Sequence, residues 1–182
     1  MKVIKIIFVA LVLIVTTLAG LIAFQPSSYS VTRTSETIRA TPGEVFGYIN
    51  DFQQWKKWAP WFSLDPNMVQ TYSGATSGKG AVYHWKSKDD SVGEGNMEIV
   101  SSIPPKSVDI QLDFIAPFQS KNMSLLRVEE TQGGGSKVSW TMTGPSDYTA
   151  KIMTFFGMMD SMIGKDFEQG LAKLKTVAEN EQ

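Results

Sequence analysis

The chain has 182 residues, with 17 Lys and Arg against 18 Asp and Glu, 42% hydrophobic residues, one His and no Cys. This length suits one ordinary domain with a full core plus a short N-terminal segment. The composition excludes disulfides, thiol nucleophiles, Cys-ligated zinc, iron–sulfur clusters and a multi-histidine metal site. Because the balance is mildly acidic and no basic block is present, we expect no nucleic-acid partner, and we expect no metal or other cofactor.

An uncharged, apolar run covers residues 6–24. It is close to the roughly 20 residues that a helix needs to span a bilayer. A cleaved secretory signal is the alternative, but its apolar core is usually about 7–15 residues long and ends in a small-x-small site. We therefore predict a membrane anchor over residues 1–24. Since Lys2 and Lys5 precede the run, the positive-inside rule places the N-terminus in the cytoplasm and the domain on the other side.

The rest of the chain is predicted to be a single domain, residues 31–182, that follows a short linker, residues 25–30. Pro and Ser in the linker favour an extended connection that lifts the domain off the membrane. The domain should begin with a strand over residues 32–38, because this segment is rich in β-branched side chains.

Two short helices are expected next. Thr41 fits the N-cap of the first, with Pro42 at the first helical position and Glu44 three residues after the cap. This spacing is typical of a capping box, in which the two side chains accept hydrogen bonds from each other's backbone amides. The second helical segment, residues 53–58, carries two Trp side chains on one side.

The middle of the chain switches to a period of two residues, which is typical of strands with one buried and one solvated face. The clearest case is residues 108–114, where Val, Ile, Leu and Phe alternate with Asp and Gln. Residues 81–86, 96–99 and 137–143 follow the same pattern. Short Gly-, Asp- and Pro-rich turns separate these segments, so we predict an antiparallel meander.

A helical period returns after Ser146, the expected N-cap, and continues to Val177. We predict one long amphipathic helix that covers the dry face of the sheet, because the sheet has no other large apolar partner. Gly157, Gly164 and Gly170 lie within this helix, so at least one of them should mark a kink or a close approach. The fold class is therefore α+β.

His84 is the candidate general acid or base at neutral pH, since it is the one His in the chain. It shares a strand face with Lys86, which favours the solvated side of the sheet. A surface His without catalytic duty is the simpler interpretation. No nucleophile elbow, dinucleotide loop or phosphate loop accompanies it.

Asp160 and Asp166 lie on or beside the apolar stripe of the last helix. A carboxylate that faces a dry interior needs a partner or a raised pKa, and such groups can mark a functional site. The structural alternative is that Asp166 caps a helix restarted after Gly164, while Asp160 bonds to a strand or loop. An enzyme of cyclase or hydrolase type would need Asp160, Asp166 or His84 as its acid or base.

Met and aromatic side chains gather where the last helix should meet the sheet. Flexible Met suits either an irregular core or a promiscuous pocket, and periodicity does not separate the two. If a cavity lies there, we expect its walls to be Tyr83, Trp85, Phe114, Trp140, Met142, Phe156, Met159 and Ile163. Another possibility is an interaction module with a filled core and a protein partner at residues 55–61.

Residues 50–61 (NDFQQWKKWAPW), 80–85 (GAVYHW), 93–95, 103–105, 138–142 and 162–171 form a series of motifs over about residues 31–178. This series resembles the START-like or SRPBCC superfamily, and within it the polyketide cyclase/dehydrase and lipid transport branch. The resemblance implies a helix-grip fold, in which a curved antiparallel sheet wraps around a long C-terminal helix and encloses a hydrophobic cavity. It implies little about reaction, because members range from lipid carriers to a few aromatic cyclases.

These interpretations together predict a membrane-anchored, non-catalytic domain that binds a lipid-like or other hydrophobic small molecule between sheet and helix. Anchoring through residues 6–24 would give such a cavity direct access to apolar ligands. A polyketide cyclase or hydrolase-type enzyme that uses the same cavity is the first alternative. The interaction module with a filled core is the second.

Overall fold

The period-two segments form one seven-stranded antiparallel sheet in the computed structural model, which describes residues 2–180. The strands are β1 (Ser28–Thr34), β2 (Val69–Gly74), β3 (Ala81–Lys86), β4 (Glu94–Ile103), β5 (Ser107–Ala116), β6 (Ser120–Glu130) and β7 (Ser136–Pro145). Their order is β1-β7-β6-β5-β4-β3-β2, so β2 to β7 are a meander and β1 pairs with its last strand. The predicted meander is confirmed.

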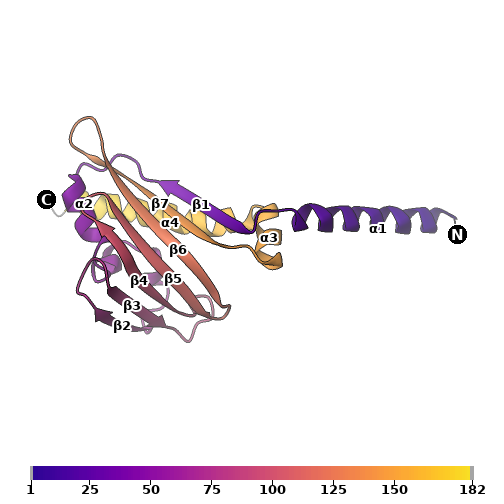
Figure 1. The fold of residues 1–182 in the computed structure, drawn as a ribbon, viewed down its shortest axis with the longest axis horizontal. Helices are drawn as coiled ribbons and strands as arrows, with labels where there is room; N and C mark the ends of the chain where they lie inside the picture. The colour runs from indigo at the N-terminus through magenta and orange to yellow at the C-terminus, as the bar shows by residue number, and fades with distance from the viewer. Residues whose placement is uncertain (1, 181–182) are drawn as a thin grey trace.

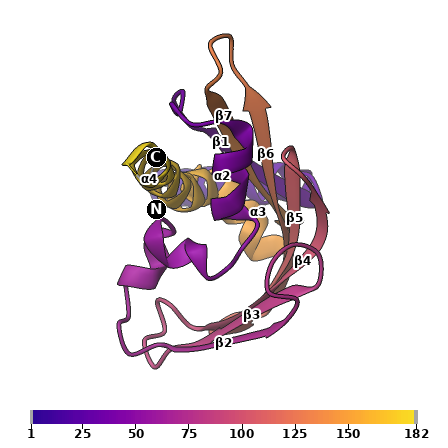
Figure 2. The same ribbon diagram turned by 90° about the vertical axis from the view of Figure 1, so that its left-hand side faces the viewer.

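Six helices complete the described chain: α1 (Lys2–Ala23), α2 (Pro42–Ile49), η1 (Gln54–Lys57), η2 (Pro60–Ser63), α3 (Tyr148–Phe155) and α4 (Met158–Asn180). The predicted capping box starts α2, because the Thr41 amide donates to the Glu44 carboxylate at 2.7 Å and the Thr41 hydroxyl accepts from the Glu44 amide. Figure 2 shows the sheet curving around α4, with α2 lying beside α4. The α+β helix-grip fold is confirmed.

The grip closes where α4 meets β7. The ring of Trp140 stacks on Phe167 with centroids 4.0 Å apart. Gly170 makes this contact possible, since a Cβ there would lie 2.9 Å from the Trp140 ring. A Cβ at Gly164 would overlap the guanidinium of Arg33 from β1. Both glycines therefore mark close approaches of the kind expected from the sequence.

The predicted single helix is interrupted. It begins at Asp147 rather than Ser146, because the Asp147 carboxylate accepts a hydrogen bond from the Ala150 amide at 2.7 Å. The chain then breaks between α3 and α4 at Gly157, whose φ of 71° favours glycine. Since α4 runs without interruption from residue 158 to 180, the expected cap at Asp166 is wrong.

The first strand lies earlier than expected. It starts at Ser28, inside the range predicted as a linker, and ends at Thr34, while Ile38 makes only an isolated bridge to Ser136. Four residues, 24–27, therefore separate α1 from the sheet. The β-branched content of residues 32–38 did not identify the strand start, because residues 28–30 are Ser and Tyr.

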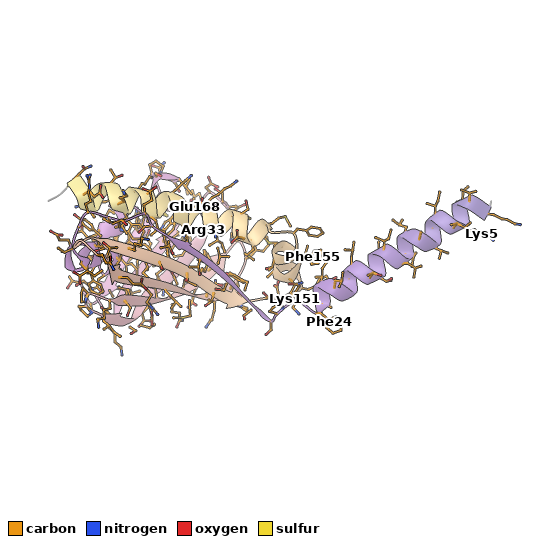
Figure 3. The ribbon with its side chains drawn as sticks, turned by 90° about the horizontal axis from the view of Figure 1, so that it is seen from above. Lys5, Phe24, Arg33, Lys151, Phe155 and Glu168 are labelled. Carbon is orange, nitrogen blue, oxygen red and sulfur yellow. The ribbon has the colours of Figure 1, made fainter. Side chains whose placement is uncertain are left out.

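Helix α1 projects from the domain as a single rod (Figure 1). Its one buried residue is Ile22. By length and composition α1 could cross a membrane, and an N-terminal signal sequence would satisfy the same criteria. Its last turn meets α3, where the Lys151 ammonium donates to the Ala23 carbonyl at 2.9 Å (Figure 3). The helix is therefore attached to the domain by side-chain contact as well as by the chain.

Candidate ligand-binding site

A continuous series of aromatic rings lines the inner face of the grip. We call it the aromatic wall, and its members are Trp140, Trp61, Phe62, Tyr83, Trp85 and Phe114. Consecutive ring centroids are 5.4 to 6.5 Å apart. Such a surface is large, apolar and polarisable, which suits an apolar ligand better than a charged one.

The strand pattern explains how β3 contributes to the wall. Tyr83 and Trp85 alternate with outward-facing residues, so both rings point inward. Trp85 crosses its neighbour β4 at Gly95, where a Cβ would overlap the indole ring. The Trp85 indole nitrogen donates to the Val92 carbonyl at 3.1 Å, which fixes the ring in this position.

The predicted cavity residues divide by burial. Tyr83, Trp85 and Trp140 are buried. Four others are half-buried, and we call them the open end of the grip because their side chains are partly accessible to solvent: Phe114, Met142, Met159 and Ile163. They belong to the last parts of β5 and β7 and the first half of α4, which is the end where α3 lies (Figure 1). Phe156 is 60% exposed and lies outside the core.

The Tyr83 hydroxyl is buried and has no hydrogen-bond partner among residues 2–180. Leaving a buried hydroxyl unpaired costs about 1–3 kcal/mol. Burial raises the pKa of Tyr83, and the neighbouring Tyr72 raises it further, so the phenol remains protonated. Tyr83 thus offers an unused hydrogen-bond donor within the aromatic wall.

Polar groups from β6 also face inward, and sequence reasoning missed them. Asn122 accepts a hydrogen bond from the Tyr29 hydroxyl at 2.8 Å and donates to Ser120 at 2.9 Å. Ser124 accepts from the Trp140 indole nitrogen at 2.8 Å. The signal was available in the phase of the strand, because Asn122 and Ser124 alternate in step with the buried residues of β6.

Two hollows of the described surface are lined by other residues than those predicted. One, of about 140 Å³, lies between Phe52 and the β2–β3 hairpin and includes Tyr72, whose ring centroid is 5.1 Å from that of Tyr83. The other, of about 570 Å³, lies beside Ile103 and Arg127 at the opposite end of the sheet from α3. The smaller hollow therefore adjoins the aromatic wall, and the larger one does not.

His84 lies on the outer face of the sheet, as its pairing in phase with Lys86 predicted. Its Nε2 is 3.3 Å from a carboxylate oxygen of Glu94, and the Lys86 ammonium is 2.7 Å from the other oxygen. The hydrogen bond from Lys86 is the main reason that the pKa of Glu94 is lowered. Because alternate strand residues face opposite ways, His84 points away from the aromatic wall.

The two candidate aspartates are also outside the interior. Asp160 is exposed and accepts two hydrogen bonds from Arg33 at 2.9 and 3.0 Å, which hold its pKa below the ordinary value. The structural alternative, a bond from Asp160 to a strand, is therefore what the structure shows. Asp166 is exposed overall, although desolvation by nearby atoms raises the pKa of its carboxyl. The structure does not bring these aspartates together with His84.

Residues 55–61, the partner region of the filled-core alternative, do not expose their aromatic side chains as a surface. Trp55 and Trp58 are fully buried, and their indole nitrogens donate to the carbonyls of Ile49 and Tyr48 at 3.1 Å. Trp61 is half-buried and belongs to the aromatic wall. Aromatic residues close together in the sequence indicate a core as readily as a binding surface, and here they form the core.

The part of the chain that the structure describes contains no cluster of three or more His, Asp or Glu able to hold a metal ion. Among the polar groups that face the interior are the hydroxyls of Tyr29, Tyr83 and Ser124 and the amide of Asn122. These groups can donate or accept hydrogen bonds at neutral pH without changing charge. The arrangement can therefore orient a ligand.

A family model described as polyketide cyclase/dehydrase and lipid transport matches residues 30–179. A comparison with curated proteins gave no match. Protein SA2116 of Staphylococcus aureus, described as of unknown function, has a similar structure with a TM-score of 0.64 at 11% identity, covering 86% of this chain and 97% of that one.

Two further solved structures are similar. Protein MLL2253 of Mesorhizobium loti gives a TM-score of 0.58 at 12% identity, and CV1439 of Chromobacterium violaceum gives 0.56 at 14%. Each comparison covers 85% of this chain and 99% of the other. At these identities the likeness shows a shared fold and carries no ligand with it.

Proposed function

Because the chain belongs to the polyketide cyclase/dehydrase and lipid transport family of SRPBCC folds, we propose that its domain binds a lipid-like small molecule between the sheet and α4. The ligand would lie along the aromatic wall and reach it through the open end of the grip. The residues proposed to contact it are Tyr83, Trp85, Phe114, Trp140, Met142, Met159 and Ile163, with Phe156 outside the entrance.

The unpaired Tyr83 hydroxyl is the observation that carries this proposal. A protein that never used this donor would gain stability by having Phe at residue 83, since the ring contacts would stay and the cost of the hydroxyl would disappear. A ligand acceptor, such as a carbonyl or ether oxygen, would satisfy the hydroxyl. The expected ligand is therefore largely apolar with one acceptor oxygen.

A binding role without catalysis is supported by where the charged groups lie. His84 contacts Glu94 and Asp160 pairs with Arg33, both outside the interior, and Asp166 lies on an exposed face of α4. The interior hydroxyl and amide groups lack the perturbed acid–base pair on which a cyclase or hydrolase of this kind would rely. Binding and orientation need only the groups that are present.

We also propose that α1 remains attached as a membrane anchor. Cleavage would remove the contact of Ile22 and the hydrogen bond from Lys151 to Ala23. A helix of 22 residues is about 33 Å long, which matches a hydrocarbon core of about 30 Å. Lys2 and Lys5 then favour a cytoplasmic N-terminus and an extracytoplasmic domain.

The binding proposal is tested with the full chain in detergent, by native mass spectrometry and by displacement of the apolar fluorophore N-phenyl-1-naphthylamine. A pair of competitors, 2-dodecanone and dodecane, differ by one acceptor oxygen. The Tyr83→Phe variant should lose affinity for the ketone by about fivefold, equivalent to about 1 kcal/mol, and keep its affinity for the hydrocarbon.

The matched control is Tyr72→Phe, whose hydroxyl already donates to Gln70 at 3.1 Å. This variant should leave the preference between ketone and hydrocarbon unchanged. Binding of neither competitor to the wild-type chain, together with an empty interior after purification from several lipid sources, would refute the proposal and favour the filled-core alternative.

A further inference from the structure

Exposed apolar side chains gather at the end of the domain next to α1. We call them the apolar collar: Phe24, Phe118, Tyr148, Phe156, Met158 and Met162. Phe24 is 92% exposed, and Phe156 and Met162 are 60% and 61% exposed. Large side chains of this kind are costly in water when they are grouped, and grouping of this sort marks a site of interaction.

One hydrogen bond joins α3 directly to α1, and a second joins the segments that flank these two helices. Besides the Lys151 contact with Ala23, the Ser146 amide donates to the Ser27 carbonyl at 2.8 Å. Figure 3 shows Lys151 and Phe24 at this junction, with Phe155 of α3 beside them. If α1 crosses a bilayer, α3 and the start of α4 must therefore lie at the surface of that same bilayer.

The sheet register places the remaining collar residue at the same end. The turn between β5 and β6, which carries Phe118, lies at the end of the sheet where β1 begins and β7 finishes. Figure 1 shows this turn on the side of the domain that faces α1. The collar thus extends from the junction with α1 towards the middle of the sheet.

The charges around the collar favour insertion over electrostatic attraction. Lys151 is bonded to the end of α1, the Asp147 carboxylate caps α3, and Asp160 is paired with Arg33. Lys121 and Lys165 are exposed and lie three residues after Phe118 and Met162, but they belong to two different elements and form no basic run in the sequence. Aromatic and Met side chains suit the boundary between headgroups and acyl chains, so the collar fits a neutral lipid surface as well as an anionic one.

The collar borders the open end of the grip. Met159 is half-buried and lies three residues from each of two collar members, Phe156 and Met162. Ile163, which is also half-buried, directly follows Met162 in α4. From this continuity we infer that the collar inserts into the interfacial layer of the bilayer that α1 spans, so that the domain takes its ligand directly from the lipid phase. This inference rests on the proposed function.

The absence of Cys from the sequence makes the test direct, because each introduced Cys carries the only spin label. Single labels are placed by Leu13→Cys in α1, Phe156→Cys and Met162→Cys in the collar, and Gln132→Cys in the exposed turn between β6 and β7. The full chain is reconstituted in phosphatidylcholine nanodiscs, and the exposure of each label to oxygen and to a water-soluble nickel chelate is measured.

We expect the label at residue 13 to lie in the hydrocarbon and the label at residue 132 to lie in water. The two collar labels, at residues 156 and 162, should lie at interfacial depth. Collar labels in water with Leu13 in the hydrocarbon would overturn the inference while leaving the anchor intact. A Leu13 label in water would instead refute the proposed anchor. Spin–spin broadening at Phe156 that disappears on dilution with unlabelled chain would show a second copy on the collar, which also overturns the inference.

Ligand uptake gives a second readout. Met162→Asp should slow transfer of a fluorescent phospholipid from vesicles to the domain at least several-fold, without changing equilibrium displacement of N-phenyl-1-naphthylamine in detergent. The matched control is Ile103→Asp, which is 55% exposed at the opposite end of the sheet and should leave transfer unchanged. Equal slowing by both variants would contradict entry through the collar.

Discussion

The indole of Trp140 occupies the space that any side chain at residue 170 would need, since a Cβ on Gly170 would lie 2.9 Å from its ring. This contact brings β7 and α4 close enough for Trp140 to stack on Phe167. The closed side of the grip therefore depends on a residue that has no side chain.

Gly170→Ala should lower stability despite its better helix propensity. Overpacking costs about 1–3 kcal/mol, which exceeds the propensity gain of about 1 kcal/mol. Gly47→Ala in α2 is the control, because nothing lies within 4 Å of the added Cβ, and it should raise stability by about 0.5–1 kcal/mol. Urea midpoints of the full chain in detergent measure both, and an equal rise in the two variants would contradict the close packing at Gly170.

Tyr83→Phe should stabilise the ligand-free protein by about 1 kcal/mol, because it removes a buried hydroxyl without a partner. The same change should reduce the additional stabilisation given by 2-dodecanone. Thermal melts with and without the ketone compare the two effects. If Tyr83→Phe destabilises the ligand-free chain, the hydroxyl makes a stabilising interaction there, and the interpretation of an unpaired donor is contradicted.

Acid should weaken the link between β1 and α4. Arg33 holds the pKa of Asp160 below its ordinary value of 3.8, chiefly through hydrogen bonds to the carboxylate. A carboxylate with a lowered pKa stabilises the fold above its unfolded-state pKa, and this contribution disappears as the pH falls through the folded-state value. Wild type should therefore melt higher than Asp160→Asn at pH 7, and the difference should vanish as the pH falls below 3.8.

The control for this pH dependence is Asp90→Asn, which alters an exposed carboxylate in the loop between β3 and β4. Its melting temperature should follow that of wild type at every pH. A constant difference between wild type and Asp160→Asn across the acid range would show that Asp160 acts through its shape and not its charge.

His84→Gln and Asp166→Asn should leave ligand occupancy unchanged, because His84 lies on the outer face of the sheet and Asp166 on an exposed face of α4. Native mass spectrometry of the purified full chain measures the fraction of protein with ligand bound. A clear fall in occupancy for either variant, with the melting temperature preserved, would revive the enzyme alternative and place that residue near the ligand.

Lys151→Met should loosen the junction between α1 and the domain. The change removes the hydrogen bond to the Ala23 carbonyl and keeps most of the aliphatic side chain. Hydrogen exchange at the amides of Gln25 and Ser146, both bonded within this junction, should become faster. Lys121→Met, at an exposed position of β6, is the matched control and should leave exchange at both amides as in wild type.

Local signals in the sequence were sufficient for much of the fold. The Thr41 capping box, the alternation in β5 and the outward direction of His84 each depend on residues within a few positions of one another. Interactions of this range follow from strand and helix periodicity alone. The curvature of the sheet was predicted from the resemblance to SRPBCC proteins, because no local pattern specifies it.

The break at Gly157 shows why the rest was not predictable. Gly157 was one of three glycines of which at least one was expected to mark a kink or a close approach, but apolar residues continue at helical spacing from α3 into α4. The pattern therefore does not show that the break falls at Gly157. The contact between Lys151 and Ala23 joins residues 128 positions apart, and nothing local to either residue indicates it. Whether the Tyr83 hydroxyl has a hydrogen-bond partner likewise depends on the arrangement of the whole core and not on residues near it in the sequence.

The hydrogen bonds at the end of α1 have a mechanical consequence. If α1 spans a bilayer, its 22 residues make it slightly longer than an average hydrocarbon core, so it would tilt more in a thin membrane than in a thick one. Because Lys151 of α3 is bonded to Ala23, the last residue of α1, the domain would then rotate with that tilt. The thickness of the surrounding membrane would then set the angle at which the grip faces the lipids.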